Sequence, residues 1–272
     1  MNDRAFVIYS NFGHGPEWEK LDTRRYYLNN IECMYMIYFL NKNYPDFDIV
    51  LYGILDSYDF LKGLNINNVK LLTGIEQKYQ LNCYFDRCLL YFHSDVSKYK
   101  YIINIDNDIH IKNVQKMKEL FEIECPDIVC RLYNFERPDL DINEKYIWGG
   151  MNIVNLDNFK KIYNLDNIKE VINKYFDETK KYNTHPYGLG SDERILTELF
   201  YYKNIYNDII DNYREFYQHA FYIVYPGCDP LIDKLKLLKN IEGDNCFLKF
   251  LDLNNLTSIY KFYMNYILTN KF

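Results

Sequence analysis

The sequence predicts an α/β protein in which helices flank a mixed, mostly parallel sheet and a helical extension follows at the C-terminal end. Short apolar runs of strand length alternate with segments of helical periodicity, the pattern of a parallel sheet with crossover helices. The run YIINID at 101–106 ends in acidic residues, and in such sheets ligands bind where strands end. The last roughly forty residues carry only helical patterns.

The first half of the chain alternates strands with helices. Residues 24–45 carry apolar side chains at 27, 28, 31, 34, 35, 38 and 39, which is helical spacing, and Pro45 ends it. Apolar runs of strand length and one further helix are predicted around this segment. The strands are expected at 4–12, 47–55 and 67–74, and the helix at 75–94.

The second half continues the alternation. After the strand that ends at Asp106, we expect a helix at 114–123, strands at 126–134 and 147–156, and a long helix to about residue 182. Helical periodicity returns at 229–240 and 254–268, the latter with apolar residues at 256, 259, 260, 263 and 267. We therefore predict one large domain over 1–225 and a helical extension over 226–272 that packs on it. Lysines border these stripes, so a membrane-surface or partner-binding helix pair is the alternative.

Composition narrows the class of protein. A formal net charge of −6 and a pI near 5.5 argue against sequence-independent nucleic-acid binding, which needs a basic face. The seven cysteines form no CxxC pair, so neither a zinc site nor a disulfide framework is indicated. No secretory leader or membrane-spanning run is recognisable, and we expect a cytoplasmic protein.

The segment Asp106-Asn107-Asp108 carries the clearest chemistry. In a strand, Asn104, Asp106, Asp108 and His110 share one face and the isoleucines share the other. Two carboxylates on one side repel unless a cation lies between them, and Mg²⁺ or Mn²⁺ takes such oxygen ligands together with phosphates. A calcium loop of the EF-hand type is excluded, since Ile111 and Met117 replace its glycine and glutamate. A plain Asx-turn is the structural alternative.

The order of motifs resembles the nucleotide-sugar-dependent glycosyltransferases of the GT-A fold, whose signature is a DxD after a hydrophobic strand. Three further segments follow that family's order: FVIYSN at 6–11, YIWGGMNIVNL at 146–156, and GLGSDERILTELF at 188–200. The resemblance covers roughly residues 4–225. Each motif is short, and the order of the motifs carries the resemblance.

The resemblance implies a role for each matched residue. Tyr9, Ser10 and Asn11 would contact the nucleotide, with His14 an alternative contact, and Arg87 would lie near the diphosphate or sugar. Asp106 and Asn107 would contact the donor. Trp148, Gly149 and Gly150 would form a sugar platform, with a core tryptophan beside a Gly-Gly bulge as the alternative.

The metal would be Mn²⁺ or Mg²⁺, bound by Asp106 and Asp108, and His219 is the candidate third ligand, although a buried structural histidine fits its context as well. Asp192 and Glu193 are the candidate catalytic acids. Both would lie in the first turn of a helix capped by Ser191, where acids are common for structural reasons. Consecutive helical side chains point about 100° apart, so only one can face the donor. We favour Asp192, and retention over inversion.

The predicted activity is transfer of a sugar, hexosyltransferase-like, from a nucleoside diphosphate sugar, most simply a UDP-sugar. The acceptor would be a hydroxyl of a glycan, protein or small molecule. A nucleotidyltransferase is the enzymatic alternative, but SNFGHGPEWEK after the first strand lacks the early basic residue that a triphosphate loop needs. A non-catalytic sugar-binding or structural protein on the same scaffold is the other alternative.

Overall fold

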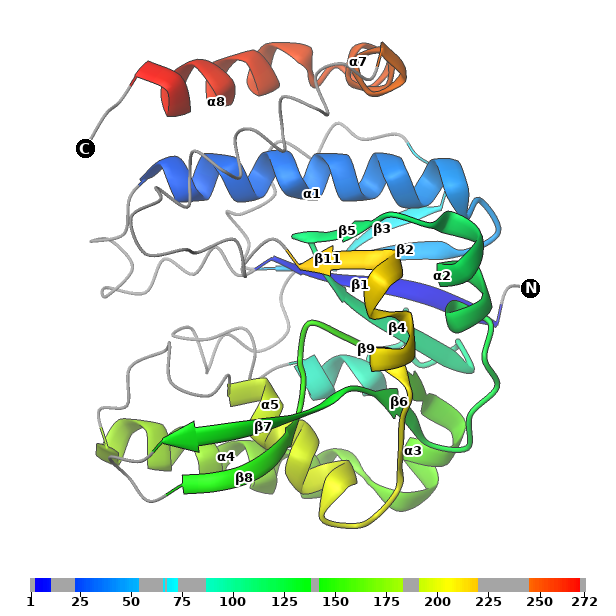
Figure 1. Ribbon diagram of the computed structural model, residues 1–272, viewed down its shortest axis with the longest axis vertical. Helices are drawn as coiled ribbons and strands as arrows, with labels where there is room; N and C mark the ends of the chain where they lie inside the picture. Colours follow the sequence, from blue (N-terminus) through cyan, green and yellow to red (C-terminus); the bar gives the residue numbers. More distant parts are fainter. Residues whose placement is uncertain are drawn as a thin grey trace.

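The computed structural model describes residues 3–10, 23–53, 66, 68–72, 87–137, 142–182, 191–219 and 245–269. A seven-stranded sheet of order β10-β6-β9-β4-β1-β2-β3 lies at its centre (Figure 1). β9 is antiparallel to both of its neighbours, and the four other pairings in this sheet are parallel. The predicted mixed, mostly parallel α/β sheet is thus confirmed.

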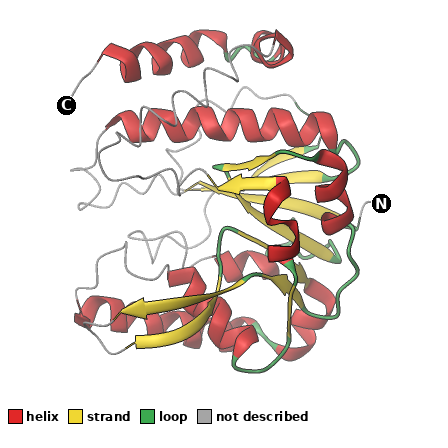
Figure 2. Cartoon of the chain, in the orientation of Figure 1, coloured by secondary structure: helices red, strands yellow, loops and turns green. Residues whose placement is uncertain are grey.

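The strands of the central sheet are short. They are β1 (Arg4–Ser10), β2 (Asp48–Gly53), β3 (Val69–Leu72), β4 (Tyr101–Asp106), β6 (Ile128–Cys130), β9 (Met151–Asn155) and β10 (Tyr206–Asp208). Two further strand pairs lie outside it (Figure 2). One joins β5 (Ile109–Ile111) to β11 (Tyr217–His219), and the other is the hairpin of β7 (Leu132–Arg137) and β8 (Ile142–Ile147).

Helices cover both faces of the sheet. The α-helices are α1 (Thr23–Asn43), α2 (Val114–Phe121), α3 (Leu156–Ile162), α4 (Leu165–Tyr182), α5 (Ser191–Leu196), α7 (Asn245–Leu253) and α8 (Thr257–Thr269). Two short 3₁₀ segments, η3 (Arg87–Phe92) and η6 (Ile210–Phe216), and a π-helical turn, η5 (Thr197–Tyr201), complete the described part.

β4 shows how the sequence sets the layers. Its side chains alternate between two apolar clusters, because successive strand residues point to opposite faces. Ile103 and Ile105 are fully buried in the cluster that includes the residues of α1, whereas Ile102 joins the cluster that includes Phe159 of α3 and Ile168 of α4. The sheet is therefore covered on both faces, and its functional groups must lie at an edge.

The C-terminal helices pack on α1, and Figure 1 shows them as a layer outside that helix. Four residues of the predicted apolar stripe, Leu256, Tyr260, Tyr263 and Ile267, are buried, and the fifth, Ile259, is partly buried. Tyr263 stacks on Tyr27 of α1, with ring centroids 4.7 Å apart. The stripe thus covers the outer side of α1 rather than the sheet itself, because α1 is apolar on both of these sides.

Several predicted boundaries differ from the structure. The strand expected at 126–134 divides at Arg131 into β6 and β7, and the strand expected at 147–156 divides around Gly149 and Gly150. The long helix divides into α3 and α4, because the side chain of Asn164 accepts a hydrogen bond from the backbone N–H of Asn167 (2.9 Å) and starts a new helix.

Some predictions fall on residues outside the described ranges. They include the helix at 229–240, most of the helix at 75–94, and the proposed domain boundary at 225. Residues 87–94 of the helix predicted at 75–94 are described, and of these Arg87–Phe92 form a 3₁₀ helix.

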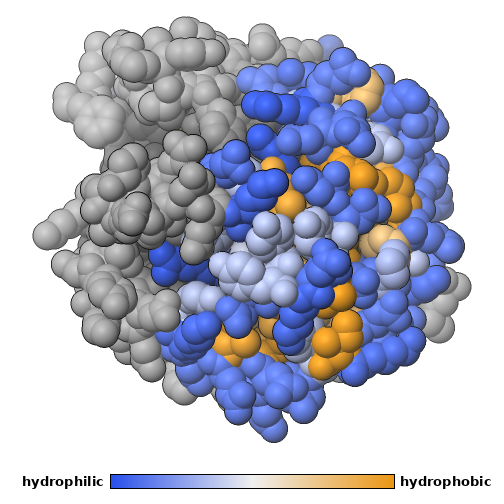
Figure 3. All heavy atoms as spheres, turned by 60° about the horizontal axis from the view of Figure 1, so that its bottom comes forward, coloured by the Kyte–Doolittle hydropathy of each residue, from blue (hydrophilic) through white to orange (hydrophobic). Residues whose placement is uncertain are grey.

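One face of the molecule, shown in Figure 3, is mostly hydrophilic where its residues are described, and apolar residues gather on it only in small, separate groups. The large apolar side chains that are most exposed are Leu253, Tyr202, Phe262 and Leu268, on or next to three different helices. Among the described residues, none of the helices combines the length and the apolarity that crossing a bilayer would need.

Candidate functional site

The predicted motifs meet at the carboxyl edge of β4. The parallel pairing of β1 with β4 sets Tyr9 opposite Asp106. On the other side of β4, the segment Trp148–Gly150, here the WGG segment, leads into the antiparallel strand β9, and the Asp106 N–H donates to the Gly150 carbonyl at 2.9 Å. The opening strand, the Asp106–Asp108 turn (the DND turn) and the WGG segment are therefore neighbours, although the sequence separates them widely.

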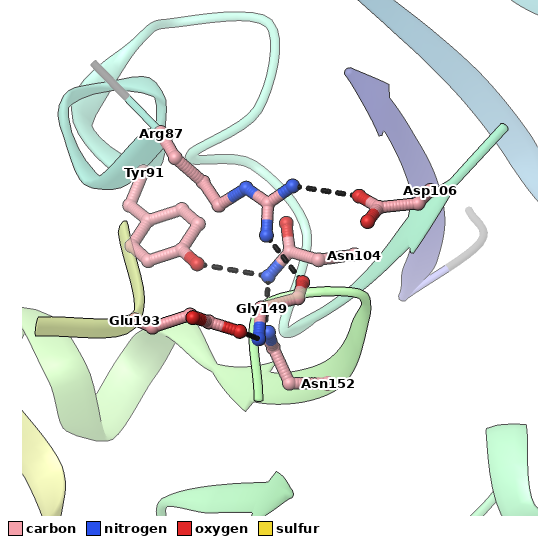
Figure 4. Close-up of polar contacts among 7 residues, drawn as sticks. All are labelled: Arg87, Tyr91, Asn104, Asp106, Gly149, Asn152 and Glu193. Carbon is pink, nitrogen blue, oxygen red and sulfur yellow. Dashed lines mark hydrogen bonds and ion pairs between the residues drawn. The ribbon is translucent and has the colours of Figure 1, made fainter. Parts of the chain in front are cut away.

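Arg87 joins two of these motifs. Its side chain is completely buried and donates one hydrogen bond to Asp106 Oδ1 at 3.0 Å and another to the Gly149 carbonyl oxygen (Figure 4). A buried guanidinium is costly unless its charge is paired and its N–H groups are satisfied. Arg87 therefore places a positive charge beside Asp106, which reduces the repulsion expected within the DND turn.

The other two residues of the DND turn are also packed. Asp108 is mostly buried, and the Asn107 side-chain amide donates to the Asn29 carbonyl of α1 at 3.2 Å. Asn107 was expected to contact the donor, and here its side chain holds the turn against α1. This contact also explains why an asparagine, with an amide donor, suits the middle of the turn.

The donor set at this edge fits a hard divalent cation in part. Two carboxylates, Asp106 and Asp108, end a strand, and Mg²⁺ characteristically takes one or two carboxylates and fills its remaining positions with phosphate oxygens and water. Within the described part of the chain, no cluster of three or more His, Cys, Asp or Glu residues could hold a metal. A third ligand of the His, Cys, Asp or Glu type would therefore have to come from outside that part.

His219 is placed by its backbone. β11 pairs antiparallel with β5, and in this register His219 lies opposite Ile109, the residue after Asp108. The strand pair thus brings the predicted third ligand position next to the DND turn. Its side chain lies outside the described residues, as do the side chains of Tyr9, Ser10 and Asp192 and the whole of Asn11 and His14.

Glu193 is tied to the site through both carboxylate oxygens. Oε1 accepts from the Gly149 N–H at 3.3 Å, and Oε2 accepts from the Tyr133 hydroxyl of the β7–β8 hairpin at 2.6 Å. The Thr197 hydroxyl bridges the same region, donating to the Glu193 carbonyl at 2.6 Å and accepting from the Ile147 N–H at 3.0 Å. Glu193 therefore holds α5, the hairpin and the WGG segment together.

Trp148 does not present an open face. Its side chain is only 4% exposed, and the indole stacks on Tyr217, with centroids 6.0 Å and planes 14° apart. The Arg131 guanidinium lies 5.4 Å from the indole centroid. This packing argues against the sugar platform expected of Trp148 and agrees with the alternative of a core tryptophan beside two glycines.

A polar network that sequence reasoning missed lies beneath the WGG segment. Asn104 of β4 and Asn152 of β9 are register partners, and both are completely buried. The Asn104 amide donates to Asn152 Oδ1 at 2.5 Å and to the Tyr91 hydroxyl at 2.8 Å (Figure 4). Because Tyr91 follows Arg87 by four residues in η3, the network fixes the segment that delivers Arg87. An asparagine inside each apolar strand was the available signal.

Comparison with solved structures finds glycosyltransferases. The chain is similar to the glycosyltransferase GlyE of Streptococcus pneumoniae TIGR4, at 17% identity and a TM-score of 0.48, over 79% of this chain and 47% of that one. It is also similar to the galactosyltransferase LgtC in complex with donor and acceptor sugar analogs, at 14% identity and a TM-score of 0.44, over 72% and 70%. Mouse xyloside xylosyltransferase 1 aligns at 12% identity and a TM-score of 0.43, over 75% and 84%.

The chain spans about half the length of the GlyE chain. No protein-family model matches the sequence, and no curated protein matches it.

Proposed function

We propose that the protein is a glycosyltransferase that moves a sugar from a nucleoside diphosphate sugar, most simply a UDP-sugar, to an acceptor hydroxyl. One observation supports this above the others. Arg87, Asp106, Gly149 and Glu193 come from four separate segments and are linked by hydrogen bonds at the carboxyl edge of β4, where α/β sheets bind ligands.

The donor would bind across the end of β1 and the DND turn. Asp106 and Asp108 would hold Mn²⁺ or Mg²⁺, which neutralises charge developing on a diphosphate leaving group. A carboxylate offers about four acceptor positions, so the bond from Arg87 leaves Asp106 the capacity for a further contact. Tyr9, Ser10 and Asn11 would contact the nucleotide, because β1 ends beside Asp106.

The two acids of α5 would divide their roles. Glu193 already accepts hydrogen bonds from Gly149 and Tyr133, so its role would be to position the WGG segment. Asp192 would then face the anomeric carbon. We favour retention of configuration, in which an acidic or polar group lies beneath that carbon, over inversion, which needs a general base for the acceptor hydroxyl.

The deciding experiment is a panel of nucleotide sugars incubated with the protein, with and without Mn²⁺, and read as release of free nucleotide. We expect hydrolysis or transfer of one donor, dependent on the metal. Release of pyrophosphate from nucleoside triphosphates with no turnover of any nucleotide sugar would support a nucleotidyltransferase instead. Absence of all turnover and of nucleotide binding would favour the non-catalytic alternative.

Variants of the DND turn test the metal. Asp108→Ala should abolish the Mn²⁺ dependence of UDP binding measured by calorimetry. Asp95→Ala, which removes a half-exposed acid next to η3, is the matched control and should bind as wild type does. If Asp106→Ala and Asp108→Ala both keep wild-type binding of UDP with Mn²⁺, the metal site is elsewhere.

Variants of the two acids test the chemistry. Loss of the essential acid should lower kcat by roughly a hundredfold or more with little change in donor affinity, and we expect this of Asp192→Asn. Glu193→Gln keeps an acceptor for Gly149 or Tyr133 and should lose less. Near-wild-type turnover in both would remove this segment from the mechanism, and NMR of the product's anomeric proton distinguishes retention from inversion.

A further inference from the structure

The contact between Trp148 and Tyr217 joins two parts of the candidate site that the sheet does not join. Trp148 belongs to the WGG segment, whereas Tyr217 begins β11, which pairs with β5 immediately after the DND turn. Both rings are 4% exposed and they stack nearly parallel. A pair so buried cannot serve as a sugar-binding face, so its role must come from what it connects.

Gly150 is adapted to this tryptophan. A Cβ built at Gly150 would lie 2.3 Å from Trp148 Cζ2 and 2.6 Å from Cε2, far inside van der Waals contact. The absence of a side chain at Gly150 therefore makes room for the indole, which in turn reaches Tyr217. The glycine and the two aromatic rings form one packing unit.

The packing unit connects the two ends of the DND turn through a series of contacts. Asp106 is bound through its N–H to the Gly150 carbonyl, and the WGG segment leads to Trp148 and, through the stack, to Tyr217. Tyr217 is the register partner of Ile111, and β5 leads back to Asp108. Each end of the DND turn is thus connected to one ring of the stack, Asp106 through Gly150 to Trp148 and Asp108 through β5 to Tyr217.

Arg131 contacts both Trp148 and the segment that precedes Tyr217. Its guanidinium packs on the Trp148 ring and its Nε lies 2.8 Å from Asp211 Oδ1 in η6, the segment just before β11. Burial raises the pKa of Tyr217, and the nearby Arg131 charge acts against this shift. Among the described residues, the buried Tyr217 hydroxyl makes no hydrogen bond of ordinary geometry, and the stacked ring is the contact that joins Tyr217 to the WGG segment.

We propose that Trp148 and Tyr217 are a positioning pair, whose stack fixes β5 and β11 against the WGG segment and thereby sets the spacing of the Asp106 and Asp108 carboxylates for a divalent cation. This inference rests on the proposed function, because it assumes that the DND turn binds a metal with a nucleoside diphosphate. It gives two buried aromatic residues a measurable effect on metal affinity without any contact with the metal.

The test is calorimetric titration of Mn²⁺ into the protein saturated with UDP. Tyr217→Leu removes the stack and should weaken Mn²⁺ binding by roughly three- to tenfold. This change in affinity corresponds to about 0.7–1.4 kcal/mol, which lies within the energy of one aromatic pair. Tyr217→Phe keeps the ring and its stack on Trp148 and should stay within about twofold of wild type. Gly150→Ala is an independent second variant, since its methyl group displaces the indole while Tyr217 is unchanged.

A matched control separates positioning from general destabilisation. Phe47 stacks on Tyr44, with centroids 6.2 Å and planes 21° apart. It is buried just before β2, at the amino end of the parallel strands, whereas the candidate site lies at their carboxyl end. Phe47→Leu should lower the melting temperature about as much as Tyr217→Leu does, with Mn²⁺ affinity unchanged.

The outcomes are distinct. If Tyr217→Leu and Gly150→Ala bind Mn²⁺ with the same affinity as Phe47→Leu, the role of the positioning pair is wrong, and the metal site of the proposed function is unaffected. Wild-type protein that binds no Mn²⁺ in the presence of UDP overturns the metal site of the proposed function, and the positioning pair with it.

Discussion

Replacing Arg87 tests how the candidate site is held. Arg87→Met keeps much of the length and volume of the side chain but removes its charge and its hydrogen bonds, including those to Asp106 and to the Gly149 carbonyl. Breaking a fully buried pair costs about 3–5 kcal/mol, whereas exposed pairs contribute about 0.2–1 kcal/mol. Since the Arg87 side chain is 0% exposed and that of Asp106 is 26% exposed, solvent screens one partner. We therefore expect a loss of about 2–4 kcal/mol of stability, and a decrease in melting temperature of roughly 4–16 °C for a chain of this size.

A double-mutant cycle isolates the ion pair from the lost packing. The free energy of unfolding in urea would be measured for wild type, Arg87→Met, Asp106→Asn and the double variant. We expect a coupling free energy of about 1–3 kcal/mol between the two positions, intermediate between exposed and buried pairs. A coupling below about 0.5 kcal/mol, the usual error of additivity for independent sites, would refute the argument that Arg87 and Asp106 hold one another.

Two further predictions concern the parts of the fold outside the site. Truncation before Asn254 removes α8 and should expose the apolar side of α1 around Tyr27, so we expect aggregation and increased binding of a hydrophobic dye. Truncation after Thr269 is the control. A protein truncated before Asn254 that stays soluble and active would contradict the packing argument. Partial burial opposes ionisation of Glu198, but hydrogen bonds from Tyr175 and Lys174 outweigh it and its pKa is lowered on folding. Its carboxylate therefore adds stability that is present above the unfolded-state pKa of about 4.3 and is lost as the pH falls through the folded-state pKa. Melting curves of wild type and Glu198→Gln should differ near neutral pH and converge in acid, and a difference that does not vary with pH would contradict this.

Local sequence pattern predicted the features that depend on neighbours along the chain. The spacing of α8 identified its buried side, and the alternation around Asp106 located the end of a central strand. The pattern could not predict which distant groups meet there. The bond of Tyr133 to Glu193 and the stack of Trp148 on Tyr217 join residues about sixty or seventy positions apart, and no period in the sequence encodes such a pairing.

The glycines of the WGG segment have a role in the structure that differs from the one expected from the sequence. Small residues in that position were expected to clear space for a sugar, but Gly150 clears space for an indole. The Gly149 N–H already donates to Glu193, and its carbonyl already accepts from Arg87. A carbonyl oxygen has two lone pairs, so it can accept a second hydrogen bond, whereas the single N–H is fully used. If a donor sugar lies against this strand, the Gly149 carbonyl can therefore accept a hydrogen bond from a sugar hydroxyl. Hydrogen bonds donated to the oxygen atoms of the sugar must come from other residues.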